Sequence, residues 1–202
     1  MLQTYTVEPT TLAILKSLQQ IPELNLTRLV GGTALALHFG HRHSVDIDLF
    51  GEIEHEDITL LLNDFKFDSF VVNRNFKNIK HYQINNVKVD IINYSYKWIE
   101  PAIEIDGIRI AGLKDIAAMK LNAITGRGSK KDFIDLYFLL NRFSLKEMLD
   151  FYSEKYPNNS VFMVIKSLTY FADAEVQQMP IMLQDADWED IKKKVCLEVE
   201  KL

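Results

Sequence analysis

The segment 29–50, LVGGTALALHFGHRHSVDIDLF, constrains the fold most strongly because it combines two costly features. The adjacent glycines Gly31 and Gly32 lose much backbone entropy on folding. Two aspartates one residue apart, Asp46 and Asp48, stand inside an apolar and β-branched run. Burying a carboxylate costs free energy unless it gains a partner. We therefore expect these residues to form a site as well as to pack.

The two aspartates lie on one face of a predicted strand. The run SVDIDLF alternates apolar and polar residues, which is typical of a half-buried strand. Residues two apart in a strand share a face, so Asp46 and Asp48 begin about 6–7 Å apart at the backbone. Two bare carboxylates at this spacing repel each other, and a divalent cation removes that repulsion. Ligands that are all oxygen favour Mg²⁺ or Mn²⁺ over Zn²⁺.

A third carboxylate, Asp90, lies in a second predicted strand. Within the run 87–94 the apolar residues share one face, and Lys88 and Asp90 share the other. If this strand pairs beside Asp46 and Asp48, three carboxylates meet on one surface. Such a set suits a two-metal phosphoryl-transfer site, in which the metals lie about 3.5–4 Å apart. Asp90 could also act as a general base.

The paired glycines suggest an anion site between a predicted strand and a predicted helix. Without β-carbons, Gly31 and Gly32 let phosphate oxygens approach backbone amides. The helix N-terminus adds free N–H donors and a favourable dipole. Thr33 is a plausible helix cap and supplies a hydroxyl. Arg42 and Ser44 are further candidates for contacts to the triphosphate or the base of a nucleotide.

Periodicity divides the chain into a mixed part, 1–111, and a helical part, 112–202. The sequence also predicts tight turns at Asn85–Asn86 and Asp106–Gly107 and a capping box from Ser129 to Asp132. Strands are expected at 26–30, 44–50, 67–73, 79–84, 87–94 and 105–111. Helices are expected at 9–21, 33–39, 55–65, 113–125, 130–143, 144–156, 160–171 and 187–202.

Composition restricts the class of protein and its surroundings. The chain has 202 residues, a formal net charge of −5 and 48% hydrophobic residues, which are globular values. An acidic chain has no global field for non-specific binding of nucleic acid. Cys196 is the only cysteine, no apolar run could span a membrane, and the first residues lack a signal-peptide pattern. We therefore expect a cytoplasmic protein in a reducing compartment, without a membrane partner.

The order of these motifs resembles a known family. Gly-Gly, then Asp-Ile-Asp, then a later strand aspartate is similar to the nucleotidyltransferase superfamily of DNA polymerase beta. The string GGTALALHFGHRHSVDIDLF resembles the AbiEii/AbiGii toxin branch, and AAMKLNAITGRGSKKDFIDLYFLL (117–140) matches its downstream signature. Many superfamily members carry Gly-Ser where this chain has Gly31-Gly32, so a serine contact to phosphate is missing unless Thr33 replaces it.

The resemblance implies a fold, an activity and partners. The fold class is α+β: a nucleotidyltransferase-like mixed sheet flanked by helices at 1–111, followed by a C-terminal helical bundle at 112–202. The activity is metal-dependent transfer of a nucleotide from an NTP, with Mg²⁺ or Mn²⁺ as cofactor. The biological role is that of a toxin in a toxin–antitoxin or abortive-infection system with a cognate antitoxin. Some relatives act on the acceptor end of tRNA, so tRNA or another RNA is the expected acceptor.

The resemblance also implies roles for single residues. Gly32 and Thr33 hold the triphosphate. In the downstream signature, Lys120 or Lys131 contacts the triphosphate and Asp135 orients that lysine. Six residues thus become catalytic candidates, of which the first three also hold the metal: Asp46, Asp48, Asp90, Lys120, Lys131 and Asp135. The candidates for nucleotide binding are Gly31, Gly32, Thr33, Arg42 and Ser44.

Two other functions stay open. A nucleotidyltransferase of this type can modify a small molecule such as an antibiotic, and an inactive copy can serve as an NTP-binding module. His38, His41 and His43 suggest zinc, but no cysteine lies nearby and such histidines are more often exposed polar groups. Lys131 and Asp135 are four residues apart and could form only a helix-surface ion pair.

The segment 73–82, NRNFKNIKHY, interleaves basic and aromatic residues. This pattern is compatible with RNA contact through phosphates and base stacking. An ordinary amphipathic strand pair explains the same pattern. An RNA substrate would in any case need a local cationic surface, because the net charge of the chain repels phosphate.

Overall fold

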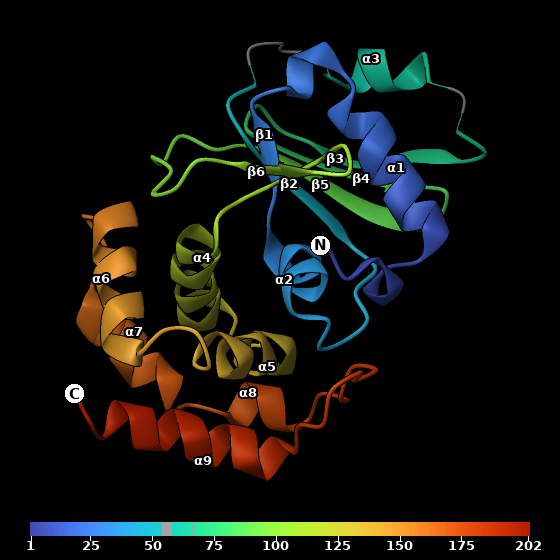
Figure 1. Ribbon diagram of the computed structural model, residues 1–202. Coiled ribbons are helices and arrows are strands. Elements are labelled where there is room, and N and C mark those ends of the chain that lie inside the picture. The colour runs from blue at the N-terminus through green and yellow to red at the C-terminus, as the bar shows by residue number, and fades with distance from the viewer. Residues whose placement is uncertain (54–57, 66) are drawn as a thin grey trace. The chain divides into compact units, whose positions relative to one another are not determined.

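One mixed sheet organises the first part of this computed structural model, which describes residues 1–53, 58–65 and 67–202 (Figure 1). Within these residues the sheet has seven strands in the order β3-β4-β5-β2-β1-β7-β6. The strands are β1 (Thr27–Leu29), β2 (Ile47–Gly51), β3 (Phe70–Asn75), β4 (Ile79–Ile84), β5 (Val87–Asn93), β6 (Ile103–Ile105) and β7 (Ile108–Ile110). The mixed sheet with its helices confirms the predicted α+β fold class.

The chain divides into two compact units, each of which has its own core. The first unit consists of Met1–His38, Ser44–Ser95 and Ala102–Ala111, and the second of Phe39–His43, Tyr96–Pro101 and Gly112–Leu202. The domain boundary after residue 111 remains a prediction. The α-helices are α1 (Pro9–Gln19), α2 (Gly31–Phe39), α3 (Ile58–Asn63), α4 (Leu113–Gly126), α5 (Lys130–Leu139), α6 (Leu145–Lys155), α7 (Val161–Leu168), α8 (Ala172–Glu175) and α9 (Trp188–Val199).

The centre of the sheet follows the predicted alternation of side chains. Ile47 and Leu49 of β2 are register partners of Val89 and Ile91 of β5, and all four side chains are fully buried. Burial of these apolar side chains stabilises the pairing, at roughly 1.5–3 kcal/mol for each fully buried residue. The residues that alternate with these apolar ones along each strand project from the opposite face of the sheet.

Two tight turns connect antiparallel strands as predicted. Asn85 and Asn86, between β4 and β5, have φ angles of 47° and 65°. Asp106 and Gly107, between β6 and β7, have φ angles of 56° and 74°. Two consecutive positive φ angles suit the right-handed twist of a hairpin, and Asn, Asp and Gly adopt them at the lowest strain. Both turn predictions are confirmed.

Helix α2 begins two residues earlier than the sequence suggested. Gly31 is its first residue, with a φ of +71°, so both glycines belong to the first turn. Thr33 therefore lies inside the helix, and the prediction that it caps the helix is wrong. The predicted helix 55–65 corresponds to α3, whose start at Ile58 leaves 55–57 outside the described residues. The four-residue α8 was not predicted.

The second unit is helical, and its α5 starts at the predicted cap. The Ser129 side chain and the Asp132 carboxylate form a capping box. Behind it, Phe133 is fully buried, with its ring centroid 4.9 Å from that of Phe171 and 6.1 Å from that of Trp188. In the described part of the chain, no helix is both long and apolar enough to cross a membrane.

Candidate active site

Asp48 and Asp90 are register partners on the adjacent parallel strands β2 and β5. Partners in register project from the same face, and neighbouring strands lie about 4.8 Å apart. The strand pairing on which the three-carboxylate hypothesis depended is therefore present. Asp46 precedes the first residue of β2, Ile47, because the strand is shorter than predicted.

Two basic side chains, Lys88 and His81, hold the carboxylate of Asp90, which is itself buried. Lys88 Nζ lies 2.7 Å from Asp90 Oδ2, and His81 Nδ1 lies 2.7 Å from Asp90 Oδ1. His81 is also the register partner of Asp90 across the hairpin. His81 is not among the site residues predicted from the sequence, although counting outward from the Asn85–Asn86 turn places it opposite Asp90. It fixes the orientation of Asp90.

The pKa of Lys88 is shifted by the charges of all three aspartates. Burial is the largest effect and lowers its pKa. The hydrogen bond to Asp90 and the charges of Asp90, Asp48 and Asp46 together outweigh burial and raise the pKa of Lys88 above its usual range. All three carboxylates thus stabilise a positive charge at this point. The field and the oxygen donors fit Mg²⁺ or Mn²⁺.

A metal ion can bind to these aspartates only if the surrounding side chains rearrange. Among the described residues, no three His, Cys, Asp or Glu side chains are already arranged as ligands of one ion. Both oxygens of Asp90 accept hydrogen bonds, one of them from Lys88. The side chain of Lys88 is 54% exposed, so it can swing toward solvent. Asp90 can therefore join Asp46 and Asp48 in binding an ion only if Lys88 moves away, or if Asp90 contacts Lys88 and the ion at the same time.

Gly31 allows Asp48 to lie against the start of α2. A β-carbon on Gly31 would lie 3.0 Å from Asp48 Cγ and still closer to Oδ2. The φ of +71° is also a conformation that glycine adopts with little strain. The carboxylate of Asp48 thus lies at a helix N-terminus, where backbone N–H groups lack partners within the helix. The half-buried Gly32 follows as the second residue of the helix.

Thr33 and Ser44 are buried and join α2 to the segment that carries Asp46. The hydroxyl of Thr33 lies 2.9 Å from that of Ser44 and donates to the backbone carbonyl of Asp46. The amide of Ser44 donates to the carbonyl of Thr6 at 2.9 Å. Both side chains hold Asp46 in place beside the glycine turn. Their direct contact with a nucleotide stays a prediction.

A second group of charged residues surrounds Asp135 inside the helical unit. Arg42 donates from Nε to Asp135 Oδ1 at 2.8 Å and from Nη2 to Oδ2 at 2.9 Å. His41 Nε2 lies 2.8 Å from Oδ1, and Lys120 Nζ lies 2.7 Å from Oδ2. The structure therefore brings Lys120 to Asp135, whereas Lys131 on the same helix as Asp135 is exposed. The roles of Arg42, Lys120 and Lys131 toward a triphosphate stay predictions.

The burial of His41 contradicts the expectation that the three histidines are exposed polar groups. Its side chain is fully buried, with 0% exposure, and is not an exposed polar group. Burial is the main cause that lowers the pKa of His41, and the hydrogen bond and charge of Asp135 oppose it only in part. The neutral ring donates from Nε2, which leaves Nδ1 buried with no hydrogen-bond partner among the described residues.

Asp135 and Lys120 are both charged within this group. Burial alone would raise the pKa of Asp135, but Lys120, Arg42 and His41 hold it well below its usual range. Burial likewise opposes the charge of Lys120, but Asp135 and Asp132 raise the pKa of Lys120. Lys120 Nζ reaches Asp132 Oδ1 at 3.1 Å, so one lysine on α4 joins two carboxylates on α5.

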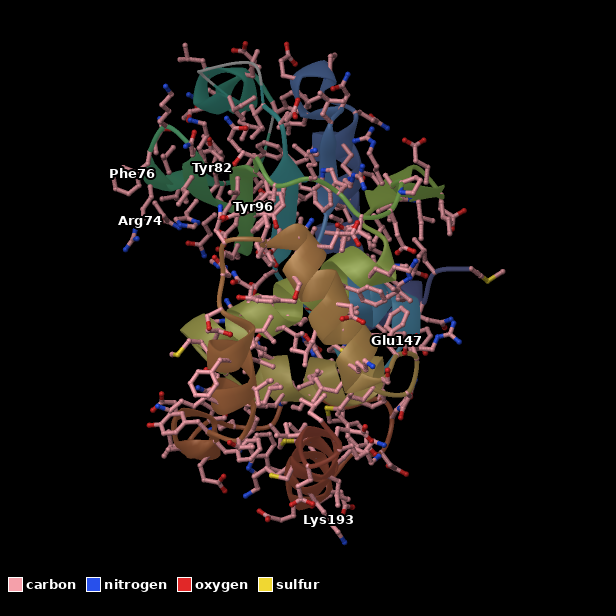
Figure 2. All side chains as sticks on the ribbon, turned by 90° about the vertical axis from the view of Figure 1, so that its left-hand side faces the viewer. Arg74, Phe76, Tyr82, Tyr96, Glu147 and Lys193 are labelled. Atoms are coloured by element: carbon pink, nitrogen blue, oxygen red, sulfur yellow. The ribbon has the colours of Figure 1, made fainter. Side chains whose placement is uncertain are left out.

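The segment 73–82 comprises the end of the edge strand β3, the turn at 76–78 and the first part of β4. Arg74 and Phe76 are exposed and project from the sheet into solvent (Figure 2). Tyr82 is fully buried, and its hydroxyl lies 2.9 Å from that of Thr59. Lys80 is also buried and donates from Nζ to Asn75 at 2.9 Å. The interleaved pattern thus combines an exposed basic and aromatic surface with an ordinary strand pair.

The chain is similar to known proteins in sequence and in fold. A family model described as "Nucleotidyl transferase AbiEii toxin, Type IV TA system" matches residues 13–201. A protein of Aquifex aeolicus (strain VF5) is 37% identical over 183 residues, which are 82% of this chain and 82% of that protein.

Two solved structures share the fold. The nucleotidyltransferase toxin MenT4 of Mycobacterium tuberculosis H37Rv superposes with a TM-score of 0.65 at 14% identity, covering 99% of this chain and 86% of MenT4. JHP933 of Helicobacter pylori superposes with a TM-score of 0.61 at 18% identity, covering 96% of this chain and 92% of JHP933. At these identities the superpositions establish the fold alone.

Proposed function

Because the chain belongs to the AbiEii family of nucleotidyltransferase toxins, and is thus a nucleotidyltransferase, we propose a metal-dependent reaction for it. In this reaction the protein transfers a nucleotide from an NTP to an acceptor and so acts as a toxin. The single observation that carries the proposal is the pairing of Asp48 with Asp90 beside the Gly31 turn. An anion site at a helix start and a cation site one strand away suit a nucleoside triphosphate with its metal.

Three carboxylates would hold the metal: Asp46, Asp48 and Asp90. A bound Mg²⁺ or Mn²⁺ supplies a Lewis acid that neutralises phosphate charge and lowers the pKa of the attacking hydroxyl. His81 keeps Asp90 oriented, because it holds one of the two carboxylate oxygens. Thr33 and Ser44 keep Asp46 in place through the contacts of α2.

The chemical step follows from these positions. The amides at Gly31 and Gly32 bind the β- and γ-phosphates at the start of α2. An acceptor hydroxyl attacks the α-phosphorus, a new P–O bond forms, and the bond to the bridging oxygen breaks. Pyrophosphate leaves with the electron pair of that bond, and the hydroxyl proton passes to the carboxylate of Asp90. Lys120 or Lys131 is the proposed contact of the triphosphate, with Asp135 orienting that lysine.

We propose RNA, and tRNA in particular, as the acceptor, in the cytoplasm of a cell that also makes an antitoxin. The exposed Arg74 on β3 and the exposed Phe76 directly after it support an RNA acceptor, since one side chain can pair with a phosphate and the other can stack on a base. Transfer to a small molecule such as an antibiotic is the alternative, and the same assay tests it.

The experiment compares wild type with Asp48→Asn in the full chain. Purified protein is incubated with each labelled NTP, Mg²⁺ or Mn²⁺, and either total tRNA or an aminoglycoside. Wild type should release pyrophosphate and label tRNA, whereas D48N should lose at least 10³-fold in rate, because one metal ligand is gone. Asp150→Asn, an exposed aspartate on α6, is the matched control and should behave as wild type.

Two outcomes would contradict the proposal. Retained transfer and retained growth inhibition in D48N would remove the aspartates from the mechanism. Labelling of the aminoglycoside but not of tRNA would replace the RNA acceptor with a small molecule. Circular dichroism of each variant establishes that the fold is intact.

A further inference from the structure

The helical unit contains a hollow of about 440 Å³, and all of its lining residues belong to that unit. The lining comes from the end of α4 and the loop after it, from α7 and the residues that follow it, and from the start of α8. Two large apolar side chains of this lining are exposed, Met163 at 46% and Tyr170 at 58%. Apolar side chains that gather on a surface mark an interaction site more often than scattered ones do.

Helix α7 turns one face to the core of its unit and the other to solvent. Val164 and Leu168, which lie one turn apart, are fully buried. Phe162, Met163 and Lys166 on the same helix are exposed, and Phe162 is 71% exposed. The outer face of a surface helix normally carries polar and charged residues. The two large apolar side chains on this face are therefore surface that a partner can bury.

Two opposite charges in the lining of this hollow are not paired. Among the described residues, neither the ammonium of Lys166 nor the carboxylate of Asp173 forms a hydrogen bond or an ion pair. Both side chains line the same hollow, yet they do not pair with each other. Arg127 also lines the hollow, but its Nε donates to Asp132 at 2.8 Å. The hollow thus presents one cation and one anion that can each gain a partner.

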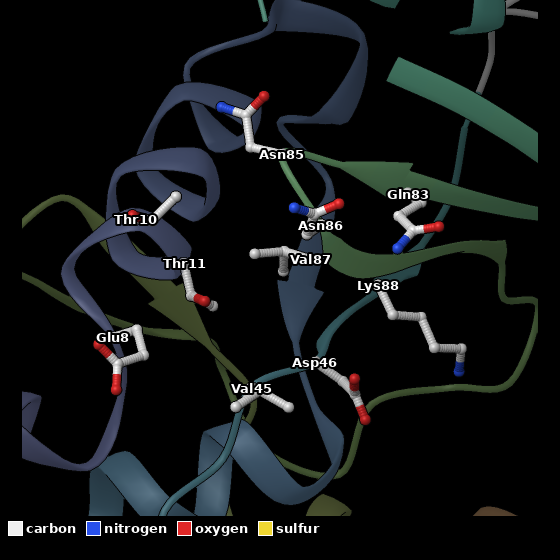
Figure 3. Close-up of a pocket in the computed structure, with 10 residues that line it drawn as sticks. All are labelled: Glu8, Thr10, Thr11, Val45, Asp46, Gln83, Asn85, Asn86, Val87 and Lys88. Carbon is white, nitrogen blue, oxygen red and sulfur yellow. The ribbon is translucent and has the colours of Figure 1, made fainter. Parts of the chain in front are cut away.

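The hollow in the first unit differs in this respect (Figure 3). It measures about 370 Å³ and is lined by the start of α1, by the turn between β4 and β5, and by Asp46 and Lys88. Among its described lining residues, Lys88 is the one cation, and its ammonium is already bound to Asp90 at 2.7 Å. An incoming group would have to compete with Asp90 for that cation. The hollow at α7 imposes no such competition.

We propose that the hollow at α7 is the centre of a homodimer interface, in which α7 and α8 of one copy pack against the same elements of a second copy. In a twofold interface, residue i of one copy meets residue j of the other, and j meets i. An axis that passes between the two charges brings Lys166 of each copy to Asp173 of the other, so both pairs form at once. The exposed Phe162, Met163 and Tyr170 are covered in the same step.

The charges favour a second copy over a different protein. A partner of another sequence must present an anion and a cation in the reverse order, whereas a second copy does so by symmetry. The inference does not depend on the proposed function, because the lining includes none of the catalytic candidates: Asp46, Asp48, Asp90, Lys120, Lys131 and Asp135.

The size of these elements sets the expected affinity. Helix α7 has eight residues and α8 has four, so the interface lies at the small end of the range, below about 1,200 Å² in total. We expect a reversible dimer with a Kd of about 1–100 µM. Sedimentation velocity of the full wild-type chain, over about 1–500 µM, measures it.

Charge reversal tests the pairing. Lys166→Glu brings two negative groups together at each of the two contacts, and Asp173→Lys brings two positive groups together. We expect either variant to raise the Kd of the dimer by about tenfold or more, because like charges across an interface repel. Both side chains are exposed, so the fold should stay intact. Lys193→Glu on α9 and Asp150→Lys on α6, both exposed and outside the lining, are the matched controls and should dimerise as wild type.

A mixture of the two variants gives the sharpest test. When K166E and D173K are combined in equal amounts, each contact of the mixed dimer again joins opposite charges. We expect the mixture to dimerise with a Kd within about threefold of wild type, although neither variant does so alone. The double variant K166E/D173K should dimerise equally well. Restored pairing also establishes that both single variants are folded.

Three outcomes would overturn the inference. Wild type that stays monomeric over the whole concentration range has no such interface. A dimer that K166E and D173K leave unchanged uses another surface. A mixture that associates no more tightly than either variant alone rules out the pairing of Lys166 with Asp173.

Discussion

Asp48 and Asp90 are register partners across the parallel pair β2 and β5, on the face opposite to the buried Ile47 and Val89. The apolar face makes this register strongly specified, because a shift of either strand by one residue would turn its own aspartate into the core. The pairing of two carboxylates is thus a consequence of core packing. The core supplies the free energy that holds two like charges side by side.

The contact between Gly31 and Asp48 predicts a severe effect of a single methyl group. Gly31→Ala should lose most NTP turnover, because its β-carbon would displace the Asp48 carboxylate. The positive φ adds strain, and we expect a loss of about 1–3 kcal/mol in the free energy of unfolding by urea. Gly126→Ala is the control, since its β-carbon would meet open space, and it should leave turnover unchanged.

Lys88 should compete with a divalent ion for Asp90. Lys88→Met removes an ammonium 2.7 Å from Asp90 Oδ2, so Mn²⁺ should bind about tenfold more tightly, as measured by calorimetry at constant pH. Lys16→Met, an exposed lysine on α1, should leave the Mn²⁺ affinity unchanged. Weaker Mn²⁺ binding in K88M would mean that the lysine supports the metal site and does not compete with it.

The Asp135 group predicts opposite behaviour of two lysines. Lys120→Met should lower the free energy of unfolding by about 1–3 kcal/mol, because it removes the cation that Asp135 and Asp132 share, although Arg42 still pairs with Asp135 and Arg127 with Asp132. Lys131→Met alters an exposed side chain and should change stability by less than about 0.5 kcal/mol. Equal effects in urea unfolding would contradict this assignment of the ion pairs.

If Lys131 contacts the triphosphate, as proposed, then K131M should raise the KM for NTP while its stability stays unchanged. An unchanged KM for NTP in K131M would leave Lys120 as the candidate from this segment. The two measurements together separate a binding role from a structural one.

His41 should make stability fall in mild acid. Its folded-state pKa lies below the usual 6.5, mainly because the ring is buried. The unfolded chain therefore binds more protons, and stability is lost as pH falls through about 6.5. His41→Gln can still donate a hydrogen bond to Asp135. We expect this variant to be less stable than wild type at pH 7.5. Between pH 7 and 5, however, the free energy of unfolding should fall less in the variant than in wild type, and the two slopes should differ by up to about 1.4 kcal/mol per pH unit. An unchanged slope would contradict the buried neutral His41.

Local features of this protein could be read from neighbouring residues in the chain. The hairpin turn at Asn85–Asn86 and the capping box of Ser129 with Asp132 depend on groups within four residues of each other. The shared face of Asp46 and Asp48 follows from the two-residue period of an extended chain. The resemblance of the motif order to a known family then implied the α+β fold, which the structure bears out.

The sequence by itself determined which residue types were available for the site and which neighbours share a face. Only the tertiary structure decided that Asp48 meets Asp90 and that His41 is buried against Asp135. Both contacts depend on burial or on pairing across the fold, and Asp135 lies 94 residues from His41. Residue patterns report local geometry, whereas burial and long-range pairing arise when apolar faces pack, which no single segment of the chain encodes.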